Sequence, residues 1–303
     1  MKQDLCTAGF RPELIAVDMD GTLLSPEGRI PPENAGAVRL AQKQGIRILI
    51  CTGRSPRDAF LPMREAGICC EAFCFNGAVL CDADGTVLNG MPLSGEAVRI
   101  AEEIAAAHGL FPDAMTEKED LTTASRNMFS HLYEAEALLP TASIGYDALR
   151  KQFQFLEGKK IFESGRSIYK LSLISEKHRN GKLTLSEARK ELLETGLFSV
   201  SSSADNNLEI TAAGISKGSA LSGYAAEHGI LLAKTAAIGD SENDLSMMQL
   251  PLGRKIAMGN AAACIKAAAD EISASNMEAG VAQAILRMSG EETGAARVLC
   301  VTG

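Results

Sequence analysis

Short apolar runs recur along the chain, and several of them end abruptly at polar residues. The first covers residues 14–17 and stops at Asp18 and Asp20. An uninterrupted apolar run of this length is typical of a strand that is buried on both faces, as in a parallel sheet. Residues 46–51, apart from Arg47, and residues 235–239, after Thr235, are similarly apolar. The pattern therefore predicts parallel strands with polar residues at their carboxyl ends.

Helical signals separate the first two runs. Pro31 and Pro32 open a helix, Gly45 ends it, and residues 46–51 follow directly. A strand, a helix and a strand in this order make a βαβ unit, so the predicted fold class is α/β, with a Rossmann-like parallel sheet as its core. The other core elements predicted are strands at 72–75 and 256–260, a hairpin turn at 82–85, and helices beginning at Pro56, Ser216, Ser241, Ala261 and Gly280.

The middle of the chain lacks this alternation of strands and helices. Ser94 caps a helix that runs to Ala107, residues 167–174 alternate like a half-exposed strand, and residues 186–194 have a helical pattern. Mixed helices and strands without βαβ order predict a separate α+β layer, which we interpret as a cap domain inserted into the core. The alternating strand and helix pattern of the core is predicted to resume with a strand at residues 208–211. The expected boundaries are a first core segment at 1–90, the cap at 91–205 and a second core segment at 206–303, of which 291–303 are peripheral.

Composition places the chain among ordinary globular proteins. With 303 residues and 46% hydrophobic content it can bury a large core, and its length favours two domains. No apolar stretch reaches the roughly 18 residues of a membrane span, and residues 1–6 lack the apolar core of a signal peptide. We therefore expect a cytoplasmic protein without a membrane partner. The net charge of -8 argues against nucleic acid as a partner, because its phosphate backbone favours basic surfaces.

The eight cysteines are predicted to be free thiols. Cys51, Cys74 and Cys81 lie in strand-like runs, Cys69 and Cys70 are adjacent, and no Cys-x-x-Cys zinc pattern occurs. Buried thiols in a reducing compartment are the expected state. The four histidines lie in no motif, so zinc is not predicted either.

Asp18 and Asp20 form the strongest candidate site. Ligands of open parallel sheets bind beyond the carboxyl ends of the strands, which is where both residues fall. An extended backbone would place their side chains on the same side. Two carboxylates held this close repel one another unless they share a cation or a proton, so the pair is suited to a hard metal ion or to proton transfer. A solvated Asp-x-Asp-Gly turn is the alternative interpretation.

The end of the second predicted strand can bind an anion. Thr52 and Gly53 would offer a hydroxyl and free backbone amides at the start of the next helix. A generic strand-to-helix turn is the alternative. Lys217 lies in the first turn of a later predicted helix, where it could also be a surface lysine.

Asp240 ends residues 235–239 in the way that Asp18 ends the first run. If these two strands are neighbours, Asp18, Asp20 and Asp240 converge at one edge of the sheet. Oxygen ligands on a rigid edge are those that Mg²⁺ prefers, usually together with a phosphate. The sequence therefore indicates Mg²⁺ as the cofactor.

Taken together, the motifs resemble those of a known family. They are Asp-Met-Asp-Gly-Thr-Leu at 18–23, Thr-Gly-Arg at 52–54, Lys217, and Gly-Asp-Ser-Glu-Asn-Asp at 239–244. This ordered set is similar to the four motifs of the haloacid dehalogenase-like superfamily. With Asn76 it looks like the Cof-type phosphatases, which carry a type IIB cap. The resemblance covers both flanks of the chain, and the middle without motifs corresponds to the substrate-selecting cap of that family.

The resemblance implies a role for each matching residue. Asp18 would attack phosphorus to form an aspartyl-phosphate, and Asp20 would protonate the leaving alkoxide and then activate water. The Mg²⁺ ligands would be the Asp18 carboxylate, the Asp20 backbone carbonyl and the Asp240 carboxylate. Asp244 would orient Lys217 or a metal-bound water, whereas an outward salt bridge would explain Arg54 equally well. The phosphate-binding positions implied are Met19, Thr52, Gly53, Lys217 and Asn243, with Asp244, Arg54 and Asn76 in supporting places.

We therefore expect a Mg²⁺-dependent phosphatase that acts on a small phosphorylated metabolite, such as a sugar phosphate or a phosphorylated cofactor. A phosphohexomutase of the same superfamily, which would return the phosphoryl group to its substrate, is one alternative. A non-catalytic protein that binds a phosphorylated ligand is another, although the presence of both Asp18 and Asp20 argues against it. The sequence names neither the substrate nor the oligomeric state.

Overall fold

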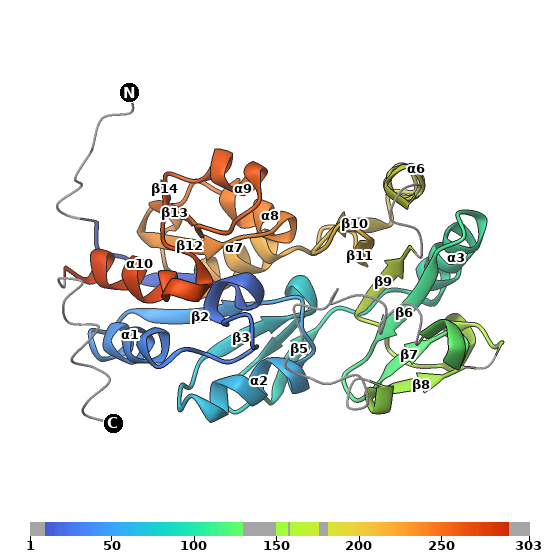
Figure 1. Ribbon diagram of the computed structural model, residues 1–303, viewed down its shortest axis with the longest axis horizontal. Coiled ribbons are helices and arrows are strands. Elements are labelled where there is room, and N and C mark those ends of the chain that lie inside the picture. Colours follow the sequence, from blue (N-terminus) through green and yellow to red (C-terminus); the bar gives the residue numbers. More distant parts are fainter. Residues whose placement is uncertain (1–9, 130–149, 157, 176–180, 291–303) are drawn as a thin grey trace.

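The computed structural model describes residues 10–129, 150–156, 158–175 and 181–290. Figure 1 shows two units side by side, a core and a cap, each built around one β-sheet. The chain leaves the core after Gly90, forms the cap, and returns to the core after Ala212. The architecture is the α/β core with an inserted α+β cap that the sequence predicts.

Within the described residues, eight strands form the core sheet. The strand after residue 13 lies at its centre and pairs in parallel on both sides, whereas a hairpin forms one antiparallel edge. The central strand is wholly buried, which accounts for its uninterrupted apolar sequence. In sheet order the strands are β14 (Glu271–Ile272), β13 (Arg254–Ala257), β12 (Thr235–Gly239), β1 (Leu14–Val17), β2 (Arg47–Cys51), β3 (Glu71–Cys74), β4 (Val79–Cys81) and β5 (Val87–Gly90).

Helices cover both faces of the core sheet. α1 (Pro32–Lys43) packs on α10 (Gly280–Ser289), whereas α7 (Lys217–Glu227) packs on α8 (Leu245–Met248), which contacts α9 (Ala263–Ala268). Because the sheet grows in opposite directions from β1, right-handed crossovers place α1 and α9 on opposite faces. A further helix, α2 (Pro56–Glu65), connects β2 to β3.

Serine caps begin the helices that follow the predicted site loops. Ser55 Oγ accepts a hydrogen bond from the backbone N–H of Asp58 at the start of α2. Ser216 Oγ accepts one from the backbone N–H of Ser219 at the start of α7. Such caps satisfy backbone donors that a helix end leaves free, and they fix where the helix begins. Lys217 is therefore the first residue of α7, as the sequence predicts.

In the part of the cap that the structure describes, six strands form the sheet. α3 (Gly95–Ala107) and α6 (Gly181–Glu194) pack against one face, where apolar side chains form a second hydrophobic cluster. The opposite face is turned towards the core (Figure 1). In sheet order the strands are β10 (Phe198–Ser201), β11 (Asn207–Ala212), β9 (Lys170–Ile174), β6 (Phe111–Met115), β7 (Asp120–Thr122) and β8 (Phe153–Phe155).

β11 corrects the predicted boundary between the cap and the second core segment. The sequence predicts that the cap ends at 205 and that residues 208–211 form a strand of the core. The strand is present as β11, but it pairs with β9 and β10 in the cap sheet. The prediction is wrong because a short apolar strand has the same pattern in either sheet, and only its pairing partners distinguish the two. The return to the core therefore lies between β11 and α7.

Smaller differences concern element ends. The helix predicted at 241–250 divides into a turn at Glu242–Asp244 and α8, and the helix predicted at 261–269 shortens to α9. The sequence does not predict β6, β7, β8, β10 or β14, all of which are short. The peripheral tail predicted at 291–303 lies outside the described residues.

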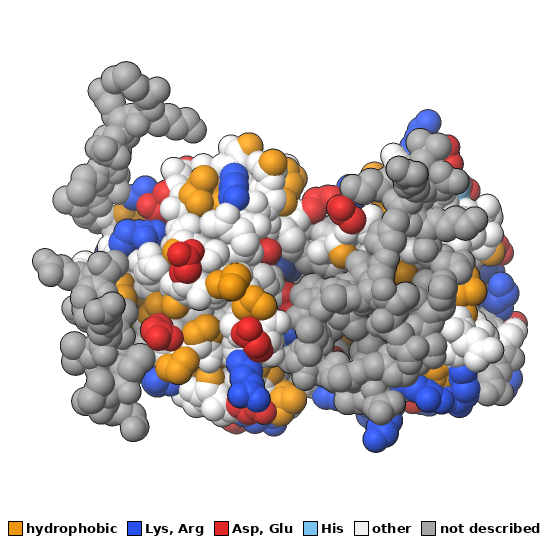
Figure 2. All heavy atoms as spheres, viewed as in Figure 1, with side chains coloured by type: hydrophobic (Ala, Val, Ile, Leu, Met, Phe, Trp, Pro, Cys, Tyr) orange, Lys and Arg blue, Asp and Glu red, His pale blue; other side chains and the backbone are white. Residues whose placement is uncertain are grey.

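The surface and the thiols can be compared with expectations from composition. Among the residues described, no helix is both long enough and apolar enough to cross a membrane. On the core face drawn in Figure 2, Lys and Arg side chains are interspersed with Asp and Glu side chains. The free cysteines include four buried thiols, at Cys51, Cys70, Cys74 and Cys81, and two exposed ones, at Cys69 and Cys264.

Candidate active site

Three core strands bring predicted site residues to one edge of the sheet. β1 lies between β2 and β12, and Val17 is paired with Ile50 on one side and Ile238 on the other. Asp18 follows β1, and Asp240 follows β12. Because parallel strands in register end at the same edge, these carboxylates meet there, next to the loop that follows β2.

The loop after β1 turns tightly beside Asp240. The backbone forms a helical turn over Met19–Leu23, in which the N–H of Leu23 donates to the carbonyl of Asp18. Gly21 has a φ of +73°, and a Cβ at this position would lie 2.2 Å from Asp240 Oδ2. Glycine is therefore required for both the backbone conformation and the close approach. The Met19 side chain is buried in the hydrophobic core, so only its backbone can face a phosphate group.

Lys217 is a buried residue of the site rather than a surface lysine. Its Nζ lies 2.6 Å from Asp18 Oδ1 and 2.7 Å from Asp244 Oδ1. The second oxygen of Asp244 accepts hydrogen bonds from the backbone N–H groups of Asp240 and Ser241. Asp244 thus contacts both the lysine and the loop that carries Asp240.

Negative charge exceeds positive charge around Lys217. Asp18, Asp240 and Asp244 offer oxygen atoms that all lie within 4.8 Å of one another. Burial, together with the neighbouring carboxylates, raises the pKa of Asp18 well above its ordinary value, and burial raises the pKa of Asp240 to about 7. Burial alone would lower the pKa of Lys217, but the carboxylates of Asp18 and Asp244 raise it, so the ammonium stays protonated.

The donor set fits a divalent cation. Three carboxylates against one ammonium leave a formal excess of two negative charges in a buried place. A divalent ion would neutralise that excess, and the oxygen donors are those that Mg²⁺ takes. Asp244 is fully buried, and its oxygens accept short hydrogen bonds from Lys217 Nζ at 2.7 Å and the backbone N–H of Asp240 at 2.9 Å. The Asp240 oxygens accept only longer ones, from Thr22 Oγ1 at 3.2 Å and Asn260 Nδ2 at 3.4 Å, so Asp18 and Asp240 are the carboxylates better placed to bind the ion.

Asp20 is held by Arg54 instead of by the lysine. Arg54 Nε lies 2.8 Å from Asp20 Oδ2, and its Nη2 lies 2.6 Å from Oδ1, which is a bidentate contact. Arg54 is only 8% exposed, so the outward salt bridge considered from the sequence is wrong. Burial alone would lower the pKa of Arg54, but Asp20 raises it. The Asp20 carboxylate therefore has its own counterion.

The residues expected to bind phosphate lie together beside this pair. Thr52 is fully buried, and its Oγ1 accepts a hydrogen bond from the backbone N–H of Arg54. A Cβ on Gly53 would lie 3.0 Å from Asn76 Oδ1, which in turn accepts a hydrogen bond from Asn243 Nδ2. Asn243 Oδ1 accepts one from Lys217 Nζ at 3.2 Å.

Two cap residues reach these core loops. Lys170 Nζ lies 2.8 Å from Glu209 Oε1 and 2.8 Å from the carbonyl oxygen of Gly53. Glu209 Oε2 accepts hydrogen bonds from Asn76 Nδ2 at 2.7 Å and Asn243 Nδ2 at 3.4 Å. Burial alone would raise the pKa of Glu209, but Lys170 and Asn76 lower it, so the carboxylate is ionised.

The sequence does not predict Lys170 or Glu209 as site residues. The strand predicted at 167–174 is confirmed over 170–174, but its predicted half-exposure is wrong, because β9 is buried along its whole length. Its polar positions, Lys170 and Ser172, lie under the core. The signal was a charged residue between two apolar neighbours, as Lys170 is between Tyr169 and Leu171 and Glu209 is between Leu208 and Ile210. From the sequence alone the core groups that these side chains contact are unknown, and a charged residue in a strand is equally typical of a face exposed to solvent.

Further contacts link the cap to the core on both flanks. Arg57 Nη2 lies 3.1 Å from Asp120 Oδ2, and Gln152 Nε2 lies 3.2 Å from Asp58 Oδ1. On the other flank, Arg189 of α6 forms an ion pair with Glu242. With the central contacts of Lys170 and Glu209, these pairs hold the cap closed against the catalytic edge.

One hollow lies at this interface, and another lies elsewhere on the described part of the cap. The first, of about 180 Å³, is lined by Lys217 and Asn243 from the core and by Ser199, Ser201 and Thr211 from the cap. It is smaller than the about 300–1,000 Å³ of usual ligand pockets, which suits a small polar group.

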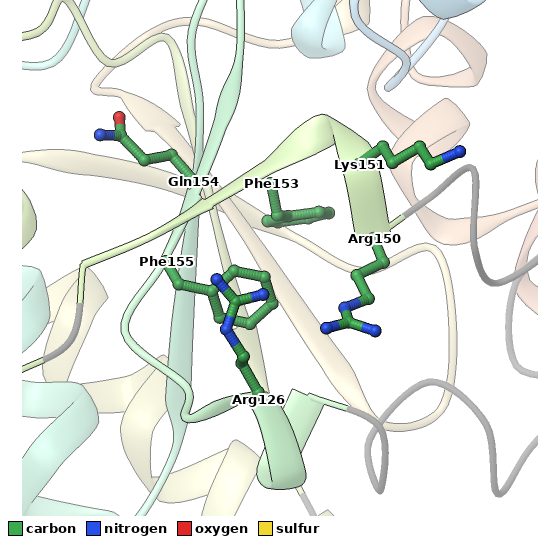
Figure 3. A pocket seen from close by; sticks show the side chains of 6 residues that line it. All are labelled: Arg126, Arg150, Lys151, Phe153, Gln154 and Phe155. Carbon is green, nitrogen blue, oxygen red and sulfur yellow. The ribbon is translucent and has the colours of Figure 1, made fainter.

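The other hollow, of about 500 Å³, lies at the β8 edge of the cap (Figure 3). The Arg126 guanidinium lies 4.6 Å from the centre of the Phe155 ring that lines it. β8 is three strands away from β9, roughly 14 Å at about 4.8 Å per strand. This hollow is therefore separate from the catalytic edge.

Comparison with known proteins agrees with the fold. A model of the family described as haloacid dehalogenase-like hydrolase matches residues 15–285. Phosphatase YwpJ of Bacillus subtilis (strain 168) is 30% identical over 282 residues, which cover 89% of this chain and 97% of that protein. The 5-amino-6-(5-phospho-D-ribitylamino)uracil phosphatase YwtE of the same organism is 30% identical over 278 residues, which cover 88% and 95%.

A solved structure has the same arrangement. A haloacid dehalogenase-like hydrolase from B. subtilis superimposes with a TM-score of 0.77 at 28% sequence identity. The match covers 90% of this chain and 98% of that one. It therefore includes the cap as well as the core.

Proposed function

This chain belongs to the haloacid dehalogenase-like hydrolases as a Cof-type phosphatase, and we propose that it hydrolyses a small phosphorylated metabolite through an aspartyl-phosphate, with Mg²⁺ as cofactor. The observation that carries the proposal is the buried Asp18 carboxylate, which Lys217 holds beside Asp240. The name of YwtE refers to a substrate with a phosphorylated ribityl chain, and a metabolite of that size is what we propose here.

In the first half-reaction, one Asp18 carboxylate oxygen attacks phosphorus. A new P–O bond to Asp18 forms while the bond between phosphorus and the leaving alkoxide breaks. Lys217 supplies positive charge beside Asp18. The Gly53 amide and Asn243 Nδ2 would supply donors for the phosphoryl oxygens, since the present hydrogen bonds of Asn243 Nδ2 are long, at 3.3 and 3.4 Å. For this step Asp20 must first take up a proton, which frees one of its oxygens from Arg54; it then gives that proton to the leaving oxygen, which departs as an alcohol.

In the second half-reaction, water replaces the alcohol. Asp20, now ionised, takes a proton from the water as its oxygen attacks phosphorus, and the bond to Asp18 breaks. Inorganic phosphate leaves, and both carboxylates regain their starting state. Arg54 binds the ionised form of Asp20, so we assign it as a positioning residue that keeps this carboxylate in place between the two proton transfers.

Mg²⁺ would be held by the carboxylates of Asp18 and Asp240 and by the backbone carbonyl of Asp20, and it would supply charge neutralisation for the transferring phosphoryl group. The excess of negative charge at Asp18, Asp240 and Asp244 supports this assignment. Thr22 Oγ1 donates to Asp240 Oδ1 at 3.2 Å and so orients that carboxylate.

The cap would close over the site and select the substrate, moving about the two chain crossings. One crossing is Gly90, where a Cβ would lie 2.7 Å from Tyr169 Cε1. The other lies after Ala212, not at the boundary predicted from the sequence. Closure would exclude water from the site while the substrate phosphate is bound, which favours attack by Asp18 over direct attack by water.

A phosphate-release assay tests the function. Purified protein with Mg²⁺ and p-nitrophenyl phosphate should release phosphate over many turnovers, whereas a binding protein would release none. A phosphohexomutase would need a bisphosphate activator and would return the phosphoryl group to a sugar. Sustained release of phosphate without an activator supports the phosphatase, and its absence would contradict it.

A further inference from the structure

The hollow at the β8 edge of the cap takes no part in the proposed reaction. Its volume of about 500 Å³ falls within the about 300–1,000 Å³ of small-molecule sites. β8 is the outermost strand on its side of the sheet in the described part of the cap. The residues that line the hollow are Arg126, Arg150, Lys151, Phe153, Gln154 and Phe155.

Two aromatic rings form the apolar part of this hollow. Phe153 and Phe155 alternate with Gln154 along β8, so both rings lie on the same face of the strand. Phe129 packs edge-on against both of them, with ring centres 4.9 and 5.2 Å apart. Neither Phe153 nor Phe155 is fully buried. The hollow therefore offers flat apolar surface that the protein already holds in place.

Two arginines reach the same hollow from separate segments of the chain. The Arg126 guanidinium lies 4.6 Å from the centre of the Phe155 ring. In Figure 3 the side chains of Arg126 and Arg150 extend into the space beside the two rings, whereas those of Lys151 and Gln154 point away from it. Two planar cations and two flat rings are thus gathered in one place.

The segments that carry the arginines are anchored. Ser125 Oγ accepts a hydrogen bond from the backbone N–H of Met128, which caps the turn that begins at Arg126. In the turn that begins at Arg150, Gln152 Nε2 donates to Asp58 Oδ1 of α2 at 3.2 Å. Anchored groups lose little conformational freedom when a ligand binds, so this arrangement is favourable for binding.

The positive charge of the hollow is not neutralised by the described protein. Neither Arg126 nor Arg150 forms an ion pair or a side-chain hydrogen bond with any residue that the structure describes. Carboxylates are not scarce, since the chain has 38 Asp and Glu against 30 Lys and Arg. Elsewhere in the cap and at its interface, arginines do pair with carboxylates, as Arg57, Arg99, Arg166 and Arg189 show. An anion would complete the two guanidinium groups, whose planar fork matches phosphate and carboxylate.

We propose that this hollow is a second ligand site, separate from the catalytic edge, and that it binds an organic anion with a flat ring, such as a nucleoside monophosphate. The guanidinium groups of Arg126 and Arg150 bind the anionic group, and Phe153 and Phe155 contact the ring. The site does not depend on the proposed phosphatase function.

Titration calorimetry of the full-length protein in excess chelator tests this proposal. Without a divalent ion the carboxylates at the catalytic edge disfavour a phosphate there, so binding at the hollow is measured by itself. Adenosine monophosphate should bind with a dissociation constant below about 1 mM. Adenosine, which lacks the anion, and ribose 5-phosphate, which lacks the flat ring, should each bind at least about tenfold more weakly. No binding of adenosine monophosphate, or binding no tighter than that of either fragment, would overturn the proposal.

Variants locate the binding. Arg126→Gln and Arg150→Gln should each weaken adenosine monophosphate at least about fivefold. Phe155→Leu keeps an apolar side chain without the ring and should bring its affinity close to that of ribose 5-phosphate. The matched control is Arg99→Gln, which removes an exposed cap arginine that pairs with Glu103, and its affinity should equal that of the parent. Binding that neither hollow arginine affects would place the ligand elsewhere and contradict the proposal.

Hydrolysis separates the hollow from the catalytic edge. Arg126 and Arg150 are exposed, so Arg126→Gln and Arg150→Gln should fold like the parent by circular dichroism. With Mg²⁺ both variants should hydrolyse p-nitrophenyl phosphate at the rate of the parent. A loss of hydrolysis in folded variants would assign the hollow to the catalytic site and overturn its independence. A parent that hydrolyses nothing would contradict the proposed function alone, since the calorimetry does not require turnover.

Discussion

The catalytic edge of the core and the facing surface of the cap both bury charged side chains, but they place them differently. In the core, Asp18 and Asp240 lie in loops directly after strands and leave an excess of negative charge around one lysine. In the cap, Lys170 and Glu209 lie within strands and neutralise one another. The first arrangement is suited to a cation and a transferring phosphoryl group. The second is suited to holding the cap against the core loops.

The largest expected effect falls on the core. Asp18→Asn keeps the volume of the side chain but removes the attacking oxygen, so turnover should fall by about 10⁴-fold or more. The measurement is the rate of phosphate release, with circular dichroism as a check of the fold. The control Asp84→Asn makes the same change at an exposed turn and should keep full activity. A rate for Asp18→Asn within tenfold of the parent would contradict its assigned role.

The second prediction concerns the metal. A chelator should stop activity, Mg²⁺ should restore it, and Ca²⁺ should inhibit, because it favours more ligands in a looser geometry. Asp240→Ala should raise the Mg²⁺ concentration for half-maximal rate by about 100-fold or more. A Mg²⁺ titration of both proteins measures this shift. Full activity in excess chelator would contradict the assignment of Asp18 and Asp240 as ligands of a catalytic Mg²⁺.

The third prediction distinguishes the role of Asp20 in proton transfer from the role of Asp18 as nucleophile. Arg54→Gln removes the bidentate partner of Asp20, so the rate should fall roughly 10- to 100-fold for an alkyl phosphate, which needs acid catalysis. The loss should be smaller for p-nitrophenyl phosphate, since its leaving group needs less protonation. Arg64→Gln, on the exposed face of α2, is the control. Equal losses for both esters would assign Arg54 a structural role instead.

The smallest effect is one on stability, in the cap. Burial raises the pKa of Asp120 to about 6, so the stability that protonated Asp120 contributes is complete below its unfolded pKa of about 3.8 and is lost as the pH rises through 6. Asp120→Asn avoids this loss. The difference in free energy of unfolding between Asp120→Asn and the parent should therefore increase, in favour of the variant, by roughly 1–3 kcal/mol from pH 4 to pH 7.

Urea unfolding of both proteins at the two pH values measures that change. Glu103→Gln, whose carboxylate is exposed, should show no comparable dependence on pH relative to the parent. A difference between parent and Asp120→Asn that stays constant from pH 4 to pH 7 would show that Asp120 is not penalised by burial.

The same contrast explains what the sequence could predict. Core residues such as Asp18 and Lys217 are recognisable because strand ends and helix starts impose their spacing along the chain. Cap residues such as Lys170 and Glu209 lie 39 positions apart and meet only through strand pairing. The boundary at β11 is missed for the same reason, since pairing partners cannot be read from one strand. Arg54 could be found from its motif, but its inward direction depends on the position of Asp20.

The central claim is that Asp18 carries the phosphoryl group during turnover. It is tested most directly by acid-quenching a single turnover and locating the phosphoryl group by mass spectrometry of proteolytic peptides. We expect a transient aspartyl-phosphate on Asp18 that forms before free phosphate appears, and none in Asp18→Asn. A phosphoryl group on any other residue, or phosphate release by the active enzyme with no labelled intermediate, would contradict the account.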